Sequence, residues 1–212
     1  MIYITGGRST GAFSMQKYHK TVYKYSIVHD EFEKIANLNE ARCAHSSCLL
    51  GSRLYVAGGT NGNTNLATIE FLDTAASQPQ QWEIFAVVDS PAFLRRMSFM
   101  CPLNADKLLI TCVHAGKIEL FNIDAESGQI SSQSKTQNAS DVRFWAERCG
   151  KVACLESGKV LAFMRNEESL FAAMYSEQSG EYDMISTCNL ESFGSMVNRT
   201  PFAETQQALL KN

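Results

Sequence analysis

A repeat of roughly 50 residues constrains the fold of this chain more than any other feature. The repeat is visible in four short strand-like segments. Their last residues are Gly6, Gly58, Cys112 and Met164. These positions lie 52, 54 and 52 residues apart. A fixed period of this size indicates an array of similar supersecondary units, each stacked on its neighbours.

An arginine recurs in register with these segments and checks the period independently. Arg42, Arg96 and Arg148 each lie 16 residues before the segment end that follows them. Two unrelated markers with the same period point to duplication of a structural unit.

Within each unit the residues are those of short strands. Segments such as "RLYVA", "KLLITCV" and "SLFAAMY" are rich in β-branched and aromatic side chains, and turn clusters such as "LGSR", "LNAD" and "SEQSGE" separate them. Helical periodicity is nearly absent before the C-terminal tail. The sequence therefore predicts an all-β fold with about four strands per unit, which is typical of a β-propeller.

Residues 41–59, "ARCAHSSCLLGSRLYVAGG", carry the most specific pattern. This stretch resembles the kelch motif in its arginine, its His45-Ser46 pair and its closing glycines Gly58 and Gly59. The N-terminal "MIYITGG", with Gly6 and Gly7, resembles it as well. A downstream aromatic pair that this resemblance implies is found in each of the first two units: Tyr25 with Phe32, and Phe71 with Trp82.

The resemblance implies a single kelch-type propeller region over residues 1–212, with about four blades of four antiparallel strands. The approximate blades are 1–40, 41–94, 95–146 and 147–195, followed by a tail, 196–212. The first unit has no first strand upstream of Gly6. We therefore expect an incomplete ring, a piece of a longer protein whose other blades would complete it, because open sheet edges are avoided in intact proteins. The alternative is a small ring closed by the tail.

Composition excludes several classes of function. A net charge of −3 offers no broad positive field for nucleic acid. No apolar run is long enough to span a membrane, and no secretory signal is visible. Seven cysteines without such a signal favour a reducing compartment, so we expect a cytoplasmic protein. Cys43, His45 and Cys48 do not predict a metal site, because a regular strand would send the two thiols to opposite faces. No cofactor is expected.

Two sets of residues are candidates for contact with a partner. In the kelch family the loops between blades and those between strands two and three emerge on one face, so Arg42, Arg96, Arg148 and His45 would approach it. Guanidinium groups bind carboxylates in bidentate fashion, which favours a short acidic peptide as the ligand. The alternative is that each arginine bonds the backbone of its own blade. The strand two-to-three loops add Arg8, Ser9, Asn61 and Asn63, with a solvated turn as the alternative.

The resulting hypothesis is a non-catalytic protein–protein interaction module. Resemblance to kelch proteins implies roles such as ubiquitin-ligase substrate adaptor or actin-associated scaffold. No nucleophile–base signature is present, although the family includes copper oxidases and sugar epimerases that use the central opening. A small-molecule enzyme of that kind and a degenerate fragment without independent function are the alternatives.

Overall fold

The computed structural model describes most of the N-terminal two thirds of the chain and the strands of the last third. The described residues are 1–11, 15–76, 81–90, 93, 98–114, 117–135, 152–155, 159–165, 169–179 and 181–189. All regular structure in these residues is β-strand, and they contain no helix. The predicted all-β class is therefore confirmed for the described part of the chain.

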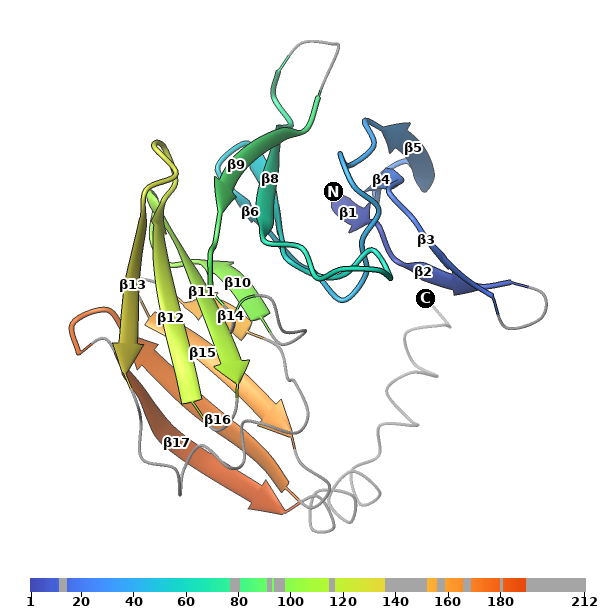
Figure 1. The fold of residues 1–212 in the computed structure, drawn as a ribbon. Helices are drawn as coiled ribbons and strands as arrows, with labels where there is room; N and C mark the ends of the chain where they lie inside the picture. The colour runs from blue at the N-terminus through green and yellow to red at the C-terminus, as the bar shows by residue number, and fades with distance from the viewer. Residues whose placement is uncertain are drawn as a thin grey trace, which may run out of the picture.

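The first sheet has three strands in the order β1-β4-β5, and a separate hairpin, β2-β3, is inserted after β1 (Figure 1). Their bounds are β1 Ile2–Thr5, β2 Arg8–Thr10, β3 Gln16–Tyr18, β4 Val22–Ser26 and β5 Glu31–Ile35. All of these pairings are antiparallel. The hairpin thus extends the connection that the sequence placed between strands two and three of the first unit.

Three further sheets follow along the chain, and each is a four-stranded antiparallel meander. The second sheet contains β6 Ser46–Leu50, β7 Arg53–Ala57, β8 Thr68–Asp73 and β9 Glu83–Val87. The third contains β10 Ser98–Pro102, β11 Lys107–His114, β12 Lys117–Asp124 and β13 Ile130–Lys135. The fourth contains β14 Val152–Leu155, β15 Lys159–Arg165, β16 Ser169–Ser176 and β17 Glu181–Asn189.

The sheets stack on one another in chain order (Figure 1). The first strand of each four-stranded sheet lies nearest its counterpart, since β10 contacts both β6 and β14. The described residues do not close a ring. The division into blades at 1–40, 41–94, 95–146 and 147–195 stays a prediction, and the tail lies outside the described residues.

The core lies between successive sheets, and the central strands of the second sheet, β7 and β8, bury side chains on both of their faces. On β7, Leu54 and Val56 pack toward the first sheet, whereas Tyr55 and Ala57 pack toward the third. Between the first two sheets the buried residues are Val22, Leu38, Leu54, Val56, Leu72 and Trp82. Between the second and third they are Tyr55, Ala57, Ile69, Val88, Phe93, Met100, Leu108, Ile110, Cys112, Phe121 and Ile123.

The two aromatic pairs noted in the sequence take different places in this core. Tyr25 and Phe32 are cross-strand neighbours in the first sheet, with ring centroids 4.7 Å apart. Phe71 instead packs on Phe85 toward the third sheet, whereas Trp82 packs toward the first and donates from Nε1 to the Ala36 carbonyl at 2.9 Å. No described helix is long and apolar enough to cross a membrane.

Candidate functional site

The exits of β1 and β7 bring the first two sheets together at one end of the molecule. Gly6, Gly7, Gly58 and Gly59 follow these strands, and all four have positive φ. A Cβ on Gly6 would lie 2.5 Å from the Arg42 carbonyl oxygen, and one on Gly59 would lie 2.5 Å from the Cys43 carbonyl oxygen. Glycine is needed there because the segment that enters the second sheet passes directly over both exits.

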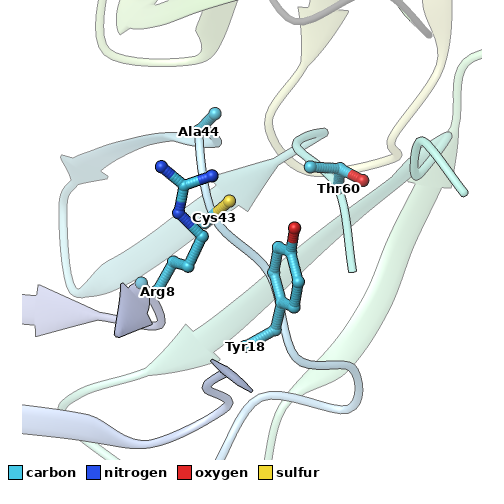
Figure 2. Close-up of a pocket in the computed structure, with 6 residues that line it drawn as sticks. Arg8, Tyr18, Cys43, Ala44 and Thr60 are labelled. Carbon is cyan, nitrogen blue, oxygen red and sulfur yellow. The ribbon is translucent and has the colours of Figure 1, made fainter. Parts of the chain in front are cut away.

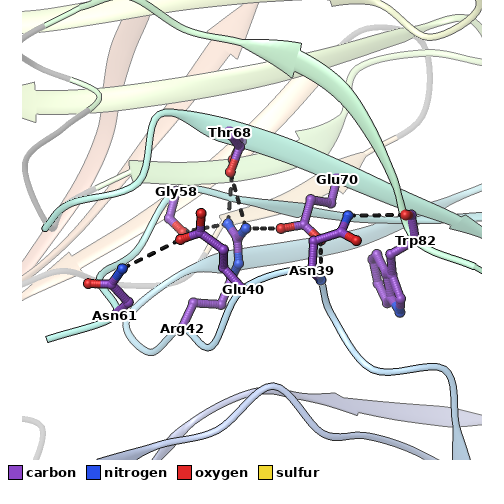
Figure 3. Close-up of polar contacts among 8 residues, drawn as sticks. All are labelled: Asn39, Glu40, Arg42, Gly58, Asn61, Thr68, Glu70 and Trp82. Atoms are coloured by element: carbon purple, nitrogen blue, oxygen red, sulfur yellow. Dashed lines mark hydrogen bonds and ion pairs between the residues drawn. The ribbon is translucent and has the colours of Figure 1, made fainter. Parts of the chain in front are cut away.

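Arg42 lies beneath this junction and is fully buried. Its guanidinium donates to the Gly58 carbonyl at 2.9 Å and to the Thr68 hydroxyl at 3.1 Å, and it forms an ion pair with the buried Glu70 carboxylate (Figure 3). Glu70 also accepts from the Asn39 backbone N–H at 2.9 Å. Burial lowers the pKa of Arg42, and the Glu70 charge opposes that shift.

These contacts favour the structural alternative for Arg42. A guanidinium with no exposed surface cannot meet a partner unless the sheet opens, and its bonds tie the entry segment to β7 and β8. A partner contact by Arg42 stays a prediction that this geometry does not favour. The corresponding Arg96 and Arg148 lie outside the described residues.

His45 is also placed inside the junction. Its Nε2 lies 2.8 Å from the Thr5 hydroxyl, and its side chain lies against the positions that a Cβ on Gly6 or Gly59 would take. Burial, with a smaller effect of the Arg42 charge, lowers the pKa of His45 to about 4. His45 is therefore neutral near pH 7, and its placement favours packing over partner contact.

A pocket of about 410 Å³ opens beside this junction, where the β2-β3 hairpin faces the second sheet (Figure 2). The described lining residues are Gly7, Arg8, Tyr18, Cys43, Ala44 and Thr60. Arg8 is the charged residue among them. In Figure 2 its guanidinium and the Tyr18 hydroxyl both project into the space below Ala44 and Thr60. We call this pocket and the loops around it the loop face.

The loop of residues 60–65 forms one wall and is held by its own hydrogen bonds. Asn61 Oδ1 accepts from the backbone N–H groups of Asn63 at 3.0 Å and Thr64 at 2.9 Å, as in an Asx turn. The Thr60 hydroxyl donates to the Thr64 carbonyl at 2.9 Å. Gly62 lies against Tyr18, since a Cβ there would be 2.4 Å from the ring. This wall is therefore formed before any partner binds.

The β2-β3 hairpin forms the other wall and separates two of the candidate residues. Arg8 pairs with Tyr18 across the hairpin, whereas Ser9 pairs with Lys17 on its opposite face. The Arg8 guanidinium donates to Gln16 Oε1 at 3.3 Å. Ser9 Oγ lies 2.7 Å from His19 Nε2. Arg8 thus faces the pocket, and Ser9 does not share its side of the hairpin.

The sequence reasoning missed Tyr18, Thr60 and Glu70. No local signal identifies Tyr18, because its place at the pocket depends on the distant Gly62, whose lack of a side chain leaves room for the Tyr18 ring. Glu70 carries no such signal, because a buried carboxylate in "ATIEFL" cannot be told from a solvated strand residue without its partner. Asn61 and Asn63, which the sequence predicted as contact residues, lie in the loop of residues 60–65 at the loop face. The Asn61 side chain accepts hydrogen bonds from the backbone of that same loop.

A second pocket, of about 360 Å³, lies at the opposite end of β7, between the second and third sheets. Arg53 and Tyr55 line it, and each donates to the Ala125 carbonyl at 3.0 Å. The Arg53 and Tyr55 side chains therefore stabilise the contact between the second and third sheets.

Neither metal nor thiol chemistry is indicated in the described residues. They contain no group of His, Cys, Asp or Glu side chains suited to a metal ion. Cys43 lies outside the regular strands, in an isolated bridge to Thr60. Cys112 is buried between sheets, and that burial raises the pKa of its thiol.

Comparison with known proteins agrees with this architecture. Residues 41–78 match the family model described as the kelch motif, a range that includes β6, β7 and β8 and both members of the Arg42–Glu70 pair. A search of curated proteins found no match. The match supports the kelch-repeat family that the motifs of the first two repeats resemble.

Proposed function

We propose that this chain is part of a kelch propeller and binds a protein partner through the loop face. Three observations support the propeller: four successive antiparallel sheets, cores between the first and second and between the second and third of them, and the contacts of β10 with both β6 and β14. A pocket of mixed polar and apolar lining, with Arg8 at its wall, lies at the meeting point of two such sheets and supports binding at that face.

Arg8 carries the proposal of an acidic ligand. It lines the pocket, and its side chain is exposed, unlike that of Arg42. Tyr18 and Thr60 also line the pocket, but their hydroxyls already donate, to Gln16 Oε1 at 3.0 Å and to the Thr64 carbonyl at 2.9 Å. The proposal therefore rests on the Arg8 guanidinium as the donor to a carboxylate. A short peptide with an Asp or Glu side chain next to the Arg8 guanidinium would gain a charge-assisted hydrogen bond there.

Panning a random peptide library against the purified chain tests the proposal. We expect the selected peptides to be enriched in Asp and Glu, and we expect Arg8→Glu to abolish their binding. Lys17→Glu is the matched control, because it makes the same charge change on the opposite face of the same hairpin. Selection without acidic enrichment, or equal losses for the two variants, would refute the role of Arg8.

The same proposal includes the compartment and the cellular role of the chain. We place the chain in the cytoplasm as an interaction module, with the substrate-adaptor role of a ubiquitin ligase as one use of such a face. Further blades of a longer chain would be its neighbours in the ring. A cooperative thermal melt of residues 1–212 would separate this proposal from the degenerate-fragment alternative.

A further inference from the structure

The Gln16 side chain bridges two residues that line the pocket of the loop face, Arg8 and Tyr18 (Figure 2). Its Oε1 accepts from the Arg8 guanidinium at 3.3 Å and from the Tyr18 hydroxyl at 3.0 Å. Gln16 and Tyr18 lie two residues apart on β3 and so share a face. Arg8 is the cross-strand partner of Tyr18 and lies on that face too. One acceptor atom therefore holds both side chains on the side of the hairpin that faces the second sheet.

Tyr18 connects this bridge to the second sheet. A Cβ on Gly62 would collide with the Tyr18 ring, so the ring lies directly against the backbone of the 60–65 loop. That loop is held by hydrogen bonds of its own. Through the Tyr18 hydroxyl, Gln16 therefore gives the Arg8 guanidinium a set position relative to the second sheet.

The bridge orients Arg8 without neutralising its charge, because an amide oxygen is an uncharged acceptor. Among the residues that the structure describes, no carboxylate lies within ion-pair distance of Arg8. The contact with Gln16 uses Nη1. The edge formed by Nε and Nη2 has no hydrogen-bond partner in the described part of the chain. This edge matches the two oxygens of a carboxylate.

We propose that Gln16 is a positioning residue of the loop face, which holds Arg8 so that its Nε–Nη2 edge receives one carboxylate of the peptide in bidentate fashion. This role depends on the peptide binding proposed above. A guanidinium that is already oriented loses less conformational entropy on binding than a free side chain does. A carboxylate in place of the Gln16 amide would also orient Arg8, but it would compete with the ligand for the charge. The neutral amide therefore gives both orientation and affinity.

Nuclear magnetic resonance of the arginine side chains in the free protein tests the orientation of Arg8. Rotation of its guanidinium about the Nε–Cζ bond should be faster in Gln16→Met than in the wild type. It should be slower in Gln16→Glu, where the acceptor is charged. The Arg8 signals are identified by their loss in Arg8→Glu. Lys17→Met is the matched control on the opposite face of β3, because it introduces the same side chain as the first variant and the same charge change as the second. Equal rotation rates in all four proteins would overturn the role of Gln16.

Fluorescence anisotropy with a library-selected acidic peptide tests whether binding uses this orientation. We expect Gln16→Met to bind about three- to tenfold more weakly than the wild type. We expect Gln16→Glu to bind more than about tenfold more weakly, although it holds Arg8 more firmly. Lys17→Met should bind within about twofold of the wild type. Circular dichroism and thermal melting check that each variant is folded.

A loss of the Gln16 role is distinguishable from a loss of peptide binding. A peptide that needs Arg8 but binds both Gln16 variants as tightly as the wild type would overturn the positioning role and leave the proposed function intact. Panning that yields no acidic peptide, or equal losses for Arg8→Glu and Lys17→Glu, would refute the proposed function. The positioning role would then fall with it, whatever the rotation rates of Arg8.

Discussion

Arg42 and Glu70 form an ion pair across the second sheet, with side chains that are 0% and 1% exposed. The pair joins the segment that enters this sheet to its third strand, β8, beneath the loop face. It holds together the two glycine exits and the pocket beside them. Buried pairs of this kind are sensitive to the loss of one partner, since the other is left as an uncompensated charge.

Replacing Arg42 should therefore destabilise the fold. We expect Arg42→Met to lower the free energy of unfolding by about 3–5 kcal/mol, because Glu70 would remain buried without its counter-ion. Adding Glu70→Met should recover part of that loss, and a double-mutant cycle from urea unfolding measures the coupling. A loss of unfolding free energy of no more than about 0.5 kcal/mol, the range of surface substitutions, would contradict the structural role of Arg42 and favour partner contact instead.

Gly6 should tolerate alanine much less well than Gly51 does. Both glycines have φ of +58°, so the backbone strain of a Cβ is the same at the two sites. A Cβ on Gly6 would lie 2.5 Å from the Arg42 carbonyl, whereas Gly51 has nothing within 4 Å. We expect Gly6→Ala to be less stable than Gly51→Ala by about 1–3 kcal/mol. Equal melting temperatures would mean that the exit of β1 is not packed as described.

Stability should depend on pH through His45. Its pKa in the folded state is about 4, below the ordinary 6.5, so the unfolded chain takes up its proton first as the pH falls. The contribution is complete above pH 6.5 and is lost progressively down to about pH 4. It amounts to about 3 kcal/mol. His45→Gln should remove this part of the pH dependence, and denaturant midpoints of both proteins between pH 4 and 7 measure it. Parallel curves would contradict the burial of His45.

Gly62 should control the shape of the pocket. Its φ of +99° also disfavours any side chain, so a thermal melt of the variant accompanies the binding measurement. A Cβ there would displace the Tyr18 ring, which lies at the end of the hairpin and can move. We expect Gly62→Ala to weaken binding of the library-selected acidic peptides at least several-fold, as fluorescence anisotropy would show. Gly51→Ala, at the other end of the second sheet, is the control. Unchanged affinity for Gly62→Ala would remove Tyr18 from the binding surface.

The repeat predicted much of the fold because strand chemistry and turn chemistry are local. The segment "RLYVAGG" specifies a buried strand and a glycine exit without reference to any distant residue. The role of Arg42 could not be predicted in the same way. Its partners Thr68 and Glu70 lie 26 and 28 residues further along the chain, and only the packing of β8 beside β7 brings them to the guanidinium.

The residues of the candidate site differ in the same way: those set by local loop chemistry could be predicted, and those set by contacts between distant segments could not. The sequence predicted Arg8, Asn61 and Asn63 as contact residues because loop residues between strands tend to be exposed and adaptable, and their contact with a partner stays a prediction. Ser9 was selected by the same rule, but strand alternation within a hairpin that the sequence did not predict turns it to the other face. Tyr18 belongs to the pocket because two hairpin strands and a distant glycine loop meet there.

Hydrogen–deuterium exchange with and without a library-selected acidic peptide tests the central claim most directly. Binding at the loop face should slow exchange in residues 7–10, 16–19, 43–45 and 60–64, with no change around the second pocket at Ser52, Arg53 and Asp106. Protection confined to that second pocket, with the loop face unaffected, would contradict the assignment of function to this end of the molecule.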